Sequence, residues 1–324
     1  MKGSISTVII SNESNAYYNL AVEKLLLNAS LSAPHLFLWQ SKNAVVIGAH
    51  QNPYAECNLA KMQEDGVQLT RRISGGGAVY HDLGNLNFCF VCPKSLYSEE
   101  NQTKLIANAL LKQNINVELS GRNDLTVNGF KISGNAYYRT KQNCLHHGTL
   151  LIASDLTRLS SYLTPPIEKL EKSGVKSVKS RVINLSEVSA DLTVEKVKNA
   201  IIEEFFATFG AKKQVLVEDL FTSLQIEEQI QLISSREYLF AKWARQNKVI
   251  SKRFDWGICY IERDSQSNNR YLKINTDSIY PTLISRVESE YLSATLGASK
   301  LIDFESDSEY EAYKELTKFL REEL

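Results

Sequence analysis

The sequence has few cysteines, no long hydrophobic run and no excess of charge of either sign. Its five cysteines are an odd, scattered number in 324 residues, which argues against a disulfide framework and favours a reducing, cytoplasmic setting. Near the N-terminus the apolar run extends only from Val8 to Ile10, too short for a signal-peptide core, and no stretch reaches the roughly 18 apolar residues of a membrane span. Basic and acidic residues number 37 each, so the chain lacks the basic excess of a typical nucleic-acid binder. We therefore expect no nucleic-acid partner and, without a candidate span, no membrane partner.

What is present is the composition of a globular protein long enough for two hydrophobic cores. Strand and helix patterns come in mixed order with hairpin turns, which predicts an α+β fold with a mixed, largely antiparallel sheet packed by helices. We expect a catalytic domain over residues 1–247 and a small α+β accessory domain over residues 251–324.

Hydrophobic periodicity and turn residues set the expected elements. Strands are expected at Thr7–Ser11, Leu36–Trp39, Ala44–Ile47, Val67–Arg72, Asn85–Cys92 and Gly148–Ala153. Helices are expected at Asn15–Ala29, Ala55–Glu64, Gln102–Gln113, Asp155–Leu163 and Val194–Phe209, with a polar helical segment at Glu218–Asn247. The second domain should contain a hairpin of Phe254–Glu262 with Tyr271–Asn275 and two helices, Ile284–Leu296 and Ser308–Glu322.

Two clusters suggest that the protein handles an anion. The first is the run Arg71–Asp82, in which Ser74 precedes three glycines whose main-chain N–H groups can converge on an anion beside two arginines. It lacks the Gly-Lys-Ser/Thr of a phosphate-binding loop and the Gly-x-Gly-x-x-Gly spacing of a dinucleotide site. An ordinary flexible turn between strands explains it equally well.

The second cluster is Gly121–Asp124 followed by Lys131–Ala136. A lysine one strand past the tight Asn128-Gly129 turn can bring a compact positive charge to phosphate or carboxylate oxygens. The simpler alternative is an exposed strand lysine.

Three other features carry less information. His146 and His147 are adjacent in an expected strand and should face opposite ways, so they cannot readily bind one metal. Cys89 and Cys92 lie in another strand, where positions three apart face opposite ways, and no second pair exists, which argues against zinc binding and redox function. The basic stretch Lys169–Arg181 fits either a loop over polyphosphate or a solvated loop.

Taken together, these clusters resemble the lipoate–protein ligase A family. The matching runs are residues 45–53, Arg71–Asp82, Gly121–Leu125, Lys131–Ala136, His146–Leu151 and Gly174–Leu185. They follow one another in order through nearly all of residues 1–210. The resemblance implies the fold of the biotin and lipoate ligases, formation of lipoyl-AMP from lipoate and ATP with Mg²⁺, and transfer of the lipoyl group to a lysine. The implied acceptors are lipoyl domains of 2-oxoacid dehydrogenases and the H protein of glycine cleavage.

The same resemblance implies site residues. Lys131 matches the catalytic lysine, which contacts the phosphate and the activated carbonyl. Contacts to ATP and lipoyl-AMP are implied for Arg72, Gly77, Ala78, Val79, Tyr80 and Lys131. The lipoate pocket and its surroundings would include Arg71, Ser74, Gly75, Gly76, His81, Asn123, Asp124, Gly134, His147, Gly148 and Thr149. A loop closing over the adenylate would include Lys176, Ser177, Val178, Ser180 and Arg181. No metal ligand is expected from the protein itself.

The chain departs from the family at two places. Ala49 stands where members often carry arginine, and Tyr238–Trp243 lacks the Gly-x-x-Pro-x-Phe element that many members show before the small domain. Two alternatives to a ligase remain open at this point. One is a transferase that moves octanoyl or lipoyl groups without ATP through Cys144, and the other is a non-catalytic binding protein with the same fold.

Overall fold

The computed structural model describes residues 5–120, 124–163, 182–210, 213–241, 249–254, 257–263, 270–276, 283, 287 and 306–323. The chain divides into two compact units, one of Met1–Gln51 with Asn58–Leu239, the other of Asn52–Cys57 with Phe240–Leu324. The predicted boundary near residue 247 stays a prediction, because residues 242–248 lie outside the described residues.

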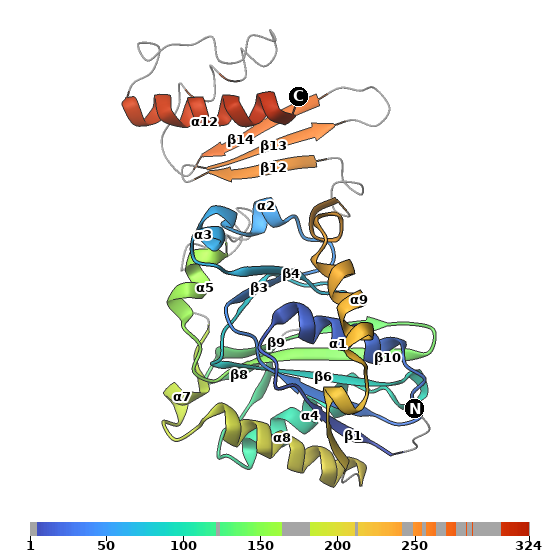
Figure 1. Ribbon diagram of the computed structural model, residues 1–324. Helices are drawn as coiled ribbons and strands as arrows, with labels where there is room; N and C mark the ends of the chain where they lie inside the picture. The colour runs from blue at the N-terminus through green and yellow to red at the C-terminus, as the bar shows by residue number, and fades with distance from the viewer. Residues whose placement is uncertain are drawn as a thin grey trace. The chain divides into compact units, whose positions relative to one another are not determined.

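The first unit is built on an eight-stranded mixed sheet in the order β11-β1-β2-β6-β10-β9-β8-β7 (Figure 1). In sequence order its strands are β1 (Thr7–Ile10), β2 (His35–Trp39), β6 (Asn85–Pro93), β7 (Glu118–Ser120), β8 (Asp124–Val127), β9 (Phe130–Arg139), β10 (Asn143–Leu151) and β11 (Lys213–Leu216). Strand β1 pairs in parallel with β11 and with β2, while the other neighbours are antiparallel. The predicted α+β class with a largely antiparallel sheet is confirmed.

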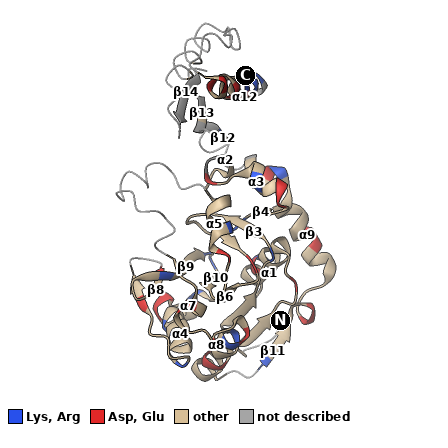
Figure 2. Ribbon diagram, turned by 90° about the vertical axis from the view of Figure 1, so that its left-hand side faces the viewer, with Lys and Arg blue, Asp and Glu red and all other residues tan. Residues whose placement is uncertain are grey.

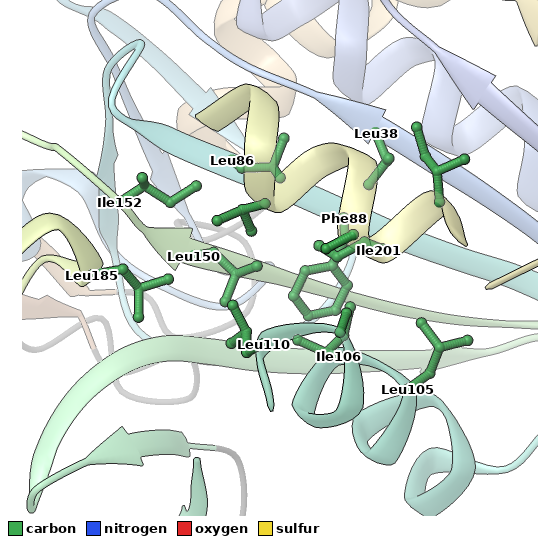
Figure 3. Packing of buried hydrophobic residues seen from close by; sticks show 14 of the residues in the cluster. Leu38, Leu86, Phe88, Leu105, Ile106, Leu110, Leu150, Ile152, Leu185 and Ile201 are labelled. Atoms are coloured by element: carbon green, nitrogen blue, oxygen red, sulfur yellow. The ribbon is translucent and has the colours of Figure 1, made fainter. Parts of the chain in front are cut away.

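Helices cover both faces of this sheet. Helices α4 (Glu99–Leu111) and α8 (Val194–Phe209) pack on one face, and α1 (Ala16–Asn28) and α9 (Ser223–Ser234) on the other. Successive side chains of β6 point to opposite faces of the sheet. Leu86, Phe88 and Phe90 pack in the core beneath α4 and α8, whereas Cys89 and Val91 pack in the core beneath α1. Figure 3 shows the Phe88 ring beside Ile106 of α4 and Ile201 of α8. Truncating such a buried phenylalanine costs about 3–5 kcal/mol.

Local signals in the sequence fix several boundaries. The Asn15 side chain accepts from the main-chain nitrogens of Tyr17 and Tyr18 and begins α1. Gly210, at φ 63°, ends α8. Asn128 and Gly129, at φ 52° and 78°, form the predicted tight turn between β8 and β9.

A second, three-stranded sheet in the same unit has the order β4-β3-β5, formed by β3 (Ala44–Ile47), β4 (Gln68–Arg71) and β5 (Val79–His81). Strands β4 and β5 flank the glycine-rich run, so both ends of that run are held by hydrogen bonds to β3. The run is therefore an anchored segment that joins two strands of one sheet.

The second unit contains an antiparallel sheet of β12 (Val249–Phe254), β13 (Gly257–Arg263) and β14 (Arg270–Thr276). Helix α12 (Asp307–Glu323) contributes Tyr313, Leu316 and Phe319 to a core shared with Phe254 and Cys259. The predicted hairpin and last helix are confirmed, although Phe254 ends β12 and does not begin β13. The predicted helix Ile284–Leu296 lies largely outside the described residues.

One helix expected from the sequence is divided in the structure. The expected helix Ala55–Glu64 is two helices, α2 (Pro53–Glu56) and α3 (Leu59–Glu64), because the Asn58 side chain caps α3 by accepting from Lys61 N. The connecting elements are η1 (Lys94–Leu96), α5 (Leu156–Tyr162), α7 (Leu185–Val188), η3 (Val217–Asp219) and η4 (Glu237–Ala241).

The surface of the described residues mixes both charge signs. Basic and acidic residues occur together on α3, α4 and α8 (Figure 2). None of the described helices has the length and apolar character needed to cross a membrane.

Candidate functional site

A pocket of about 220 Å³ opens in the first unit, on the α1 face of the large sheet. Most of the expected site residues line it, namely Arg72, Gly76, Gly77, Ala78, Val79, His81, Asp124, Lys131, Gly134, His147, Gly148 and Thr149. These residues come from two sheets and are separated by up to 77 positions in the chain (149 − 72). The fold therefore joins the two clusters that the sequence singled out separately.

Arg72 shapes the glycine segment from within. Its side chain is buried and donates from Nη2 to the carbonyl oxygens of Gly75 (2.7 Å) and Gly77 (2.8 Å), and from Nη1 to that of Val46 (3.1 Å). Burial lowers the pKa of Arg72 to about 10, which still leaves the guanidinium charged at neutral pH. Gly76 has φ 95°, and a Cβ there would lie 2.8 Å from Arg72 Nη2, so this position requires glycine.

A buried polar network forms one end of the pocket. Glu23 accepts from Trp39 Nε1 at 3.1 Å, and its other oxygen lies 2.8 Å from His147 Nδ1. The carboxylate partner places a proton on His147 Nδ1, and His147 Nε2 is hydrogen-bonded to the Ser74 hydroxyl at 2.6 Å. Arg72 Nε in turn donates to Ser74 Oγ at 3.2 Å. The network thus ties α1, the sheet and the glycine segment together.

Two further buried side chains in the lining have nitrogen atoms without a hydrogen-bond partner among the described residues. Neither ring nitrogen of His81 nor the amide nitrogen of Asn87 has one among the described residues. His81 packs edge-on against Trp39 with ring centroids 5.7 Å apart. Burial, with the charge of Arg72 nearby, lowers the pKa of His81 to about 3, so the ring is neutral at pH 7.

Lys131 forms the other, more exposed end. Its Nζ lies 2.8 Å from Asp124 Oδ1, with the two side chains 38% and 40% exposed. Gly134 lies beside the ammonium group, since a Cβ there would stand 3.4 Å from Nζ, an ordinary van der Waals contact. The main chain of Lys131 bridges to Val182, and Ile183 N donates to Lys131 O at 3.1 Å. Val182 and Ile183 therefore lie directly beside Lys131.

Some expected site residues lie elsewhere. Arg71 is buried outside the lining, where Nη1 donates to the carbonyl oxygens of Gly48 (2.9 Å) and Gln51 (2.8 Å). Ser74, Gly75 and Tyr80 also lie outside the lining, and the Tyr80 hydroxyl donates to Asn43 Oδ1 at 3.2 Å. Asn123, Lys176, Ser177, Val178, Ser180 and Arg181 lie outside the described residues.

Several lining residues are not among the expected site residues. They are Leu20, Glu23, Trp39, Val46, Asn87, Asn135 and Ala136. The sequence could have indicated one of them. Glu23 lies between Leu20 and Leu27 on the apolar face of α1, where burying an unpaired carboxylate would be costly.

The pocket combines apolar walls, a buried polar end and an exposed ammonium group. This arrangement suits an acid with a hydrophobic chain.

The histidine pair and the cysteines stand apart from this chemistry. His146 faces the opposite side of the sheet from His147, between Gln102 and Asn135, as predicted from strand alternation. Cys144 is fully buried outside the lining, and burial raises the pKa of its thiol. In the described part of the chain, no three His, Cys, Asp or Glu side chains are grouped to hold a metal.

Comparison with known proteins agrees with this geometry. Residues 15–206 match the family described as the lipoyl protein ligase A/B catalytic domain. Lipoate-protein ligase A of Bdellovibrio bacteriovorus is 40% identical over 288 residues, covering 86% of this chain and 84% of that protein.

Two solved structures match over most of their length. The crystal structure of P. falciparum LipL1 in complex with lipoate matches with a TM-score of 0.67 and 28% identity, over 97% of this chain and 99% of that chain. Lipoate-protein ligase A bound with ATP matches with a TM-score of 0.61 and 25% identity, over 75% and 98%. The matched domain and the identity across most of both chains show that this chain belongs to the lipoate–protein ligase A family.

Proposed function

We propose that this protein activates lipoate with ATP and attaches the lipoyl group to a lysine of an acceptor protein. The observation that carries the proposal is a single pocket with the Lys131 ammonium at one end and Trp39, Leu20 and Val46 among its walls. One end suits a carboxylate and phosphates, and the walls suit an aliphatic chain. The lipoate and ATP complexes of structurally similar proteins support the same pair of substrates.

In the first step a carboxylate oxygen of lipoate attacks the α-phosphorus of ATP. A new P–O bond forms, the bond to the bridging oxygen breaks, and pyrophosphate leaves. Negative charge grows on the oxygens around the α-phosphorus, where the Lys131 ammonium can stabilise it. Gly76 to Val79, which line the pocket, form the wall proposed to contact the nucleotide.

In the second step the amine of an acceptor lysine attacks the lipoyl carbonyl carbon. The C–O bond to AMP breaks, an amide forms, and the amine loses a proton. We propose as acceptors the lipoyl domains of 2-oxoacid dehydrogenases or the glycine cleavage H protein, and a cytoplasmic location for the reaction.

Residues Lys176 to Arg181 are proposed to close over the adenylate and keep water from hydrolysing it. Support comes from the chain that follows them, since Val182 pairs with the main chain of Lys131.

Mg²⁺ would arrive with ATP, because this ion keeps several waters and binds chiefly through substrate phosphates. Its contribution would be to neutralise charge on the departing pyrophosphate. The protein's own part is the Lys131 ammonium and the main chain of the glycine segment.

The thiol transferase alternative is disfavoured by burial. A transfer through Cys144 needs an accessible thiolate, whereas this thiol has no exposure and a raised pKa.

The test of the proposed function is lipoate-dependent exchange of pyrophosphate into ATP by the purified protein, followed by mass analysis of acceptor domains. We expect exchange without any acceptor, and then a lipoyl mass increase on one lysine of the acceptor. Transfer of lipoyl groups in the absence of ATP, without exchange, would establish the transferase alternative.

A further inference from the structure

The polar side chains of the pocket fall into two groups. Most are already bonded to the protein: Glu23 to Trp39 and His147, Lys131 to Asp124, and the Thr149 hydroxyl to Gly134 N. The exceptions are the nitrogen atoms of His81 and Asn87, two side chains that are each 3% exposed. Their ring nitrogens and amide nitrogen have no partner among the described residues. Buried polar groups are nearly always satisfied, so these atoms indicate a missing partner.

The orientation of Asn87 is set by its neighbours. In β6, Leu86 and Phe88 point to the opposite face, so Asn87 points to the pocket face. Its Oδ1 accepts from Asn85 Nδ2 at 3.1 Å, which leaves both N–H groups of Asn87 Nδ2 for another acceptor. The neutral His81 ring supplies one more donor and one acceptor.

These donors lie at the end of the pocket away from Lys131. Gly134 lies three residues after Lys131 in β9, and its main-chain nitrogen donates to the Thr149 hydroxyl of β10. Thr149 is paired with Asn87 of the next strand, β6. Asn87 is in turn paired with Trp39 of β2. With about 4.8 Å between strands, Asn87 is about 10 Å across the sheet from β9. An eight-carbon acid with its carboxylate at Lys131 would therefore extend its far end toward Asn87 and Trp39.

The far end of the acid decides whether those donors are used. The methyl end of a saturated chain accepts no hydrogen bond and would leave the buried donors unpaired, which disfavours binding. The two ring sulfurs of lipoate are acceptors, although weak ones. We propose that Asn87 and His81 are specificity-determining residues, whose N–H groups bind the sulfur-bearing end of the acid and select lipoate over octanoate. This inference rests on the proposed function.

The test compares the two acids in the parent protein, in two variants that remove the donors at similar side-chain size, and in one control variant. Asn87→Leu and His81→Phe remove the donors, and Val91→Ala is the matched control, since Val91 lies on the same face of β6 outside the pocket. The readout is kcat/KM for pyrophosphate exchange with lipoate and with octanoate, together with calorimetric binding of each acid. We expect Asn87→Leu to lower the lipoate-to-octanoate ratio at least about tenfold, His81→Phe to lower it in the same direction, and Val91→Ala to leave it unchanged.

The outcomes separate this inference from the proposed function. If the parent protein catalyses exchange with these acids but Asn87→Leu and His81→Phe change both acids equally, the donors do not bind the sulfurs and the inference is wrong. If the parent catalyses exchange with neither acid, the proposed function fails. Should Asn87→Leu not fold by circular dichroism, His81→Phe alone decides, because its ring can keep the contact with Trp39.

Discussion

The Nζ of Lys131 lies 2.8 Å from the Oδ1 of Asp124, and each side chain is more than a third exposed. Exposed pairs of this kind contribute at most about 1 kcal/mol to stability, because water screens both charges. The ammonium group can therefore exchange a carboxylate for a ligand oxygen at little cost to the fold.

Lys131→Ala is expected to abolish adenylate formation and leave the protein folded. Loss of a charge that stabilises the transition state should lower the exchange rate by at least about 10²–10³-fold. Lys131→Arg should restore little, since a planar guanidinium cannot replace a compact ammonium beside Gly134. The measurement is pyrophosphate exchange at saturating lipoate, with circular dichroism as the folding control. A folded Lys131→Ala protein within tenfold of the parent would remove Lys131 from its catalytic role.

Gly76→Ala should damage the site where Gly75→Ala does not. Gly76 combines φ 95° with a Cβ position 2.8 Å from Arg72 Nη2, whereas a Cβ on Gly75 meets nothing within 4 Å. We expect Gly76→Ala to cost about 1–3 kcal/mol of unfolding free energy and to reduce exchange activity. Denaturant titration and exchange assays of the two variants check this. Equal effects of the two substitutions would show that the segment is not held by Arg72.

The sequence predicted elements well where a local signal sets the backbone. The Asn128-Gly129 turn and the Gly210 end of α8 are of this kind, since both need positive φ. It failed where a short polar side chain interrupts a helical pattern, as Asn58 does between α2 and α3. It also missed the short strand β5, which exists only because it pairs with β3.

The site divides in the same way. Lys131, Asp124 and the glycine segment belong to recognisable runs, but Asn87 looks like any polar residue in a half-buried strand. Its role in the pocket depends on Trp39 and Thr149 of neighbouring strands, which are 48 and 62 residues away (87 − 39 and 149 − 87). Cross-strand register of this length leaves no mark in a single sequence.

Cys144→Ala should retain ATP-dependent lipoylation. The thiol is buried outside the pocket lining, so the substitution removes one sulfur from the interior and should cost about 1–2 kcal/mol of stability. The assay is lipoylation of an acceptor domain, with mass analysis of the parent protein for an acyl group on Cys144. An acyl-Cys144 adduct together with an inactive variant would favour the transferase.

A non-hydrolysable lipoyl-AMP analogue should slow amide hydrogen exchange in residues 169–181. The proposed closing role requires this segment to gain contacts on ligand binding, next to the existing hydrogen bond from Ile183 N to Lys131 O. Peptides from α8, on the far face of the sheet, serve as the internal control. Exchange that is unchanged at 169–181 while the analogue is bound would exclude closure.

The neutral, buried His81 should make stability depend on pH in a defined window. Its pKa is about 3 in the folded protein against an ordinary 6.5, so between these values the unfolded chain binds more protons than the folded one. Stability therefore rises with pH across this window and is lost as pH falls from 6.5 toward 3. Each pH unit in this window changes the unfolding free energy by up to about 1.4 kcal/mol, and above pH 6.5 His81 no longer makes stability depend on pH.

His81→Phe removes this group and keeps the ring packed against Trp39. Other buried groups, such as His146, titrate in both proteins and cancel in the comparison. We expect the unfolding free energy of His81→Phe, relative to the parent, to increase by about 3 kcal/mol between pH 6.5 and pH 4, measured by urea titration at several pH values. Parallel pH profiles for the two proteins would mean that His81 is not held neutral by burial.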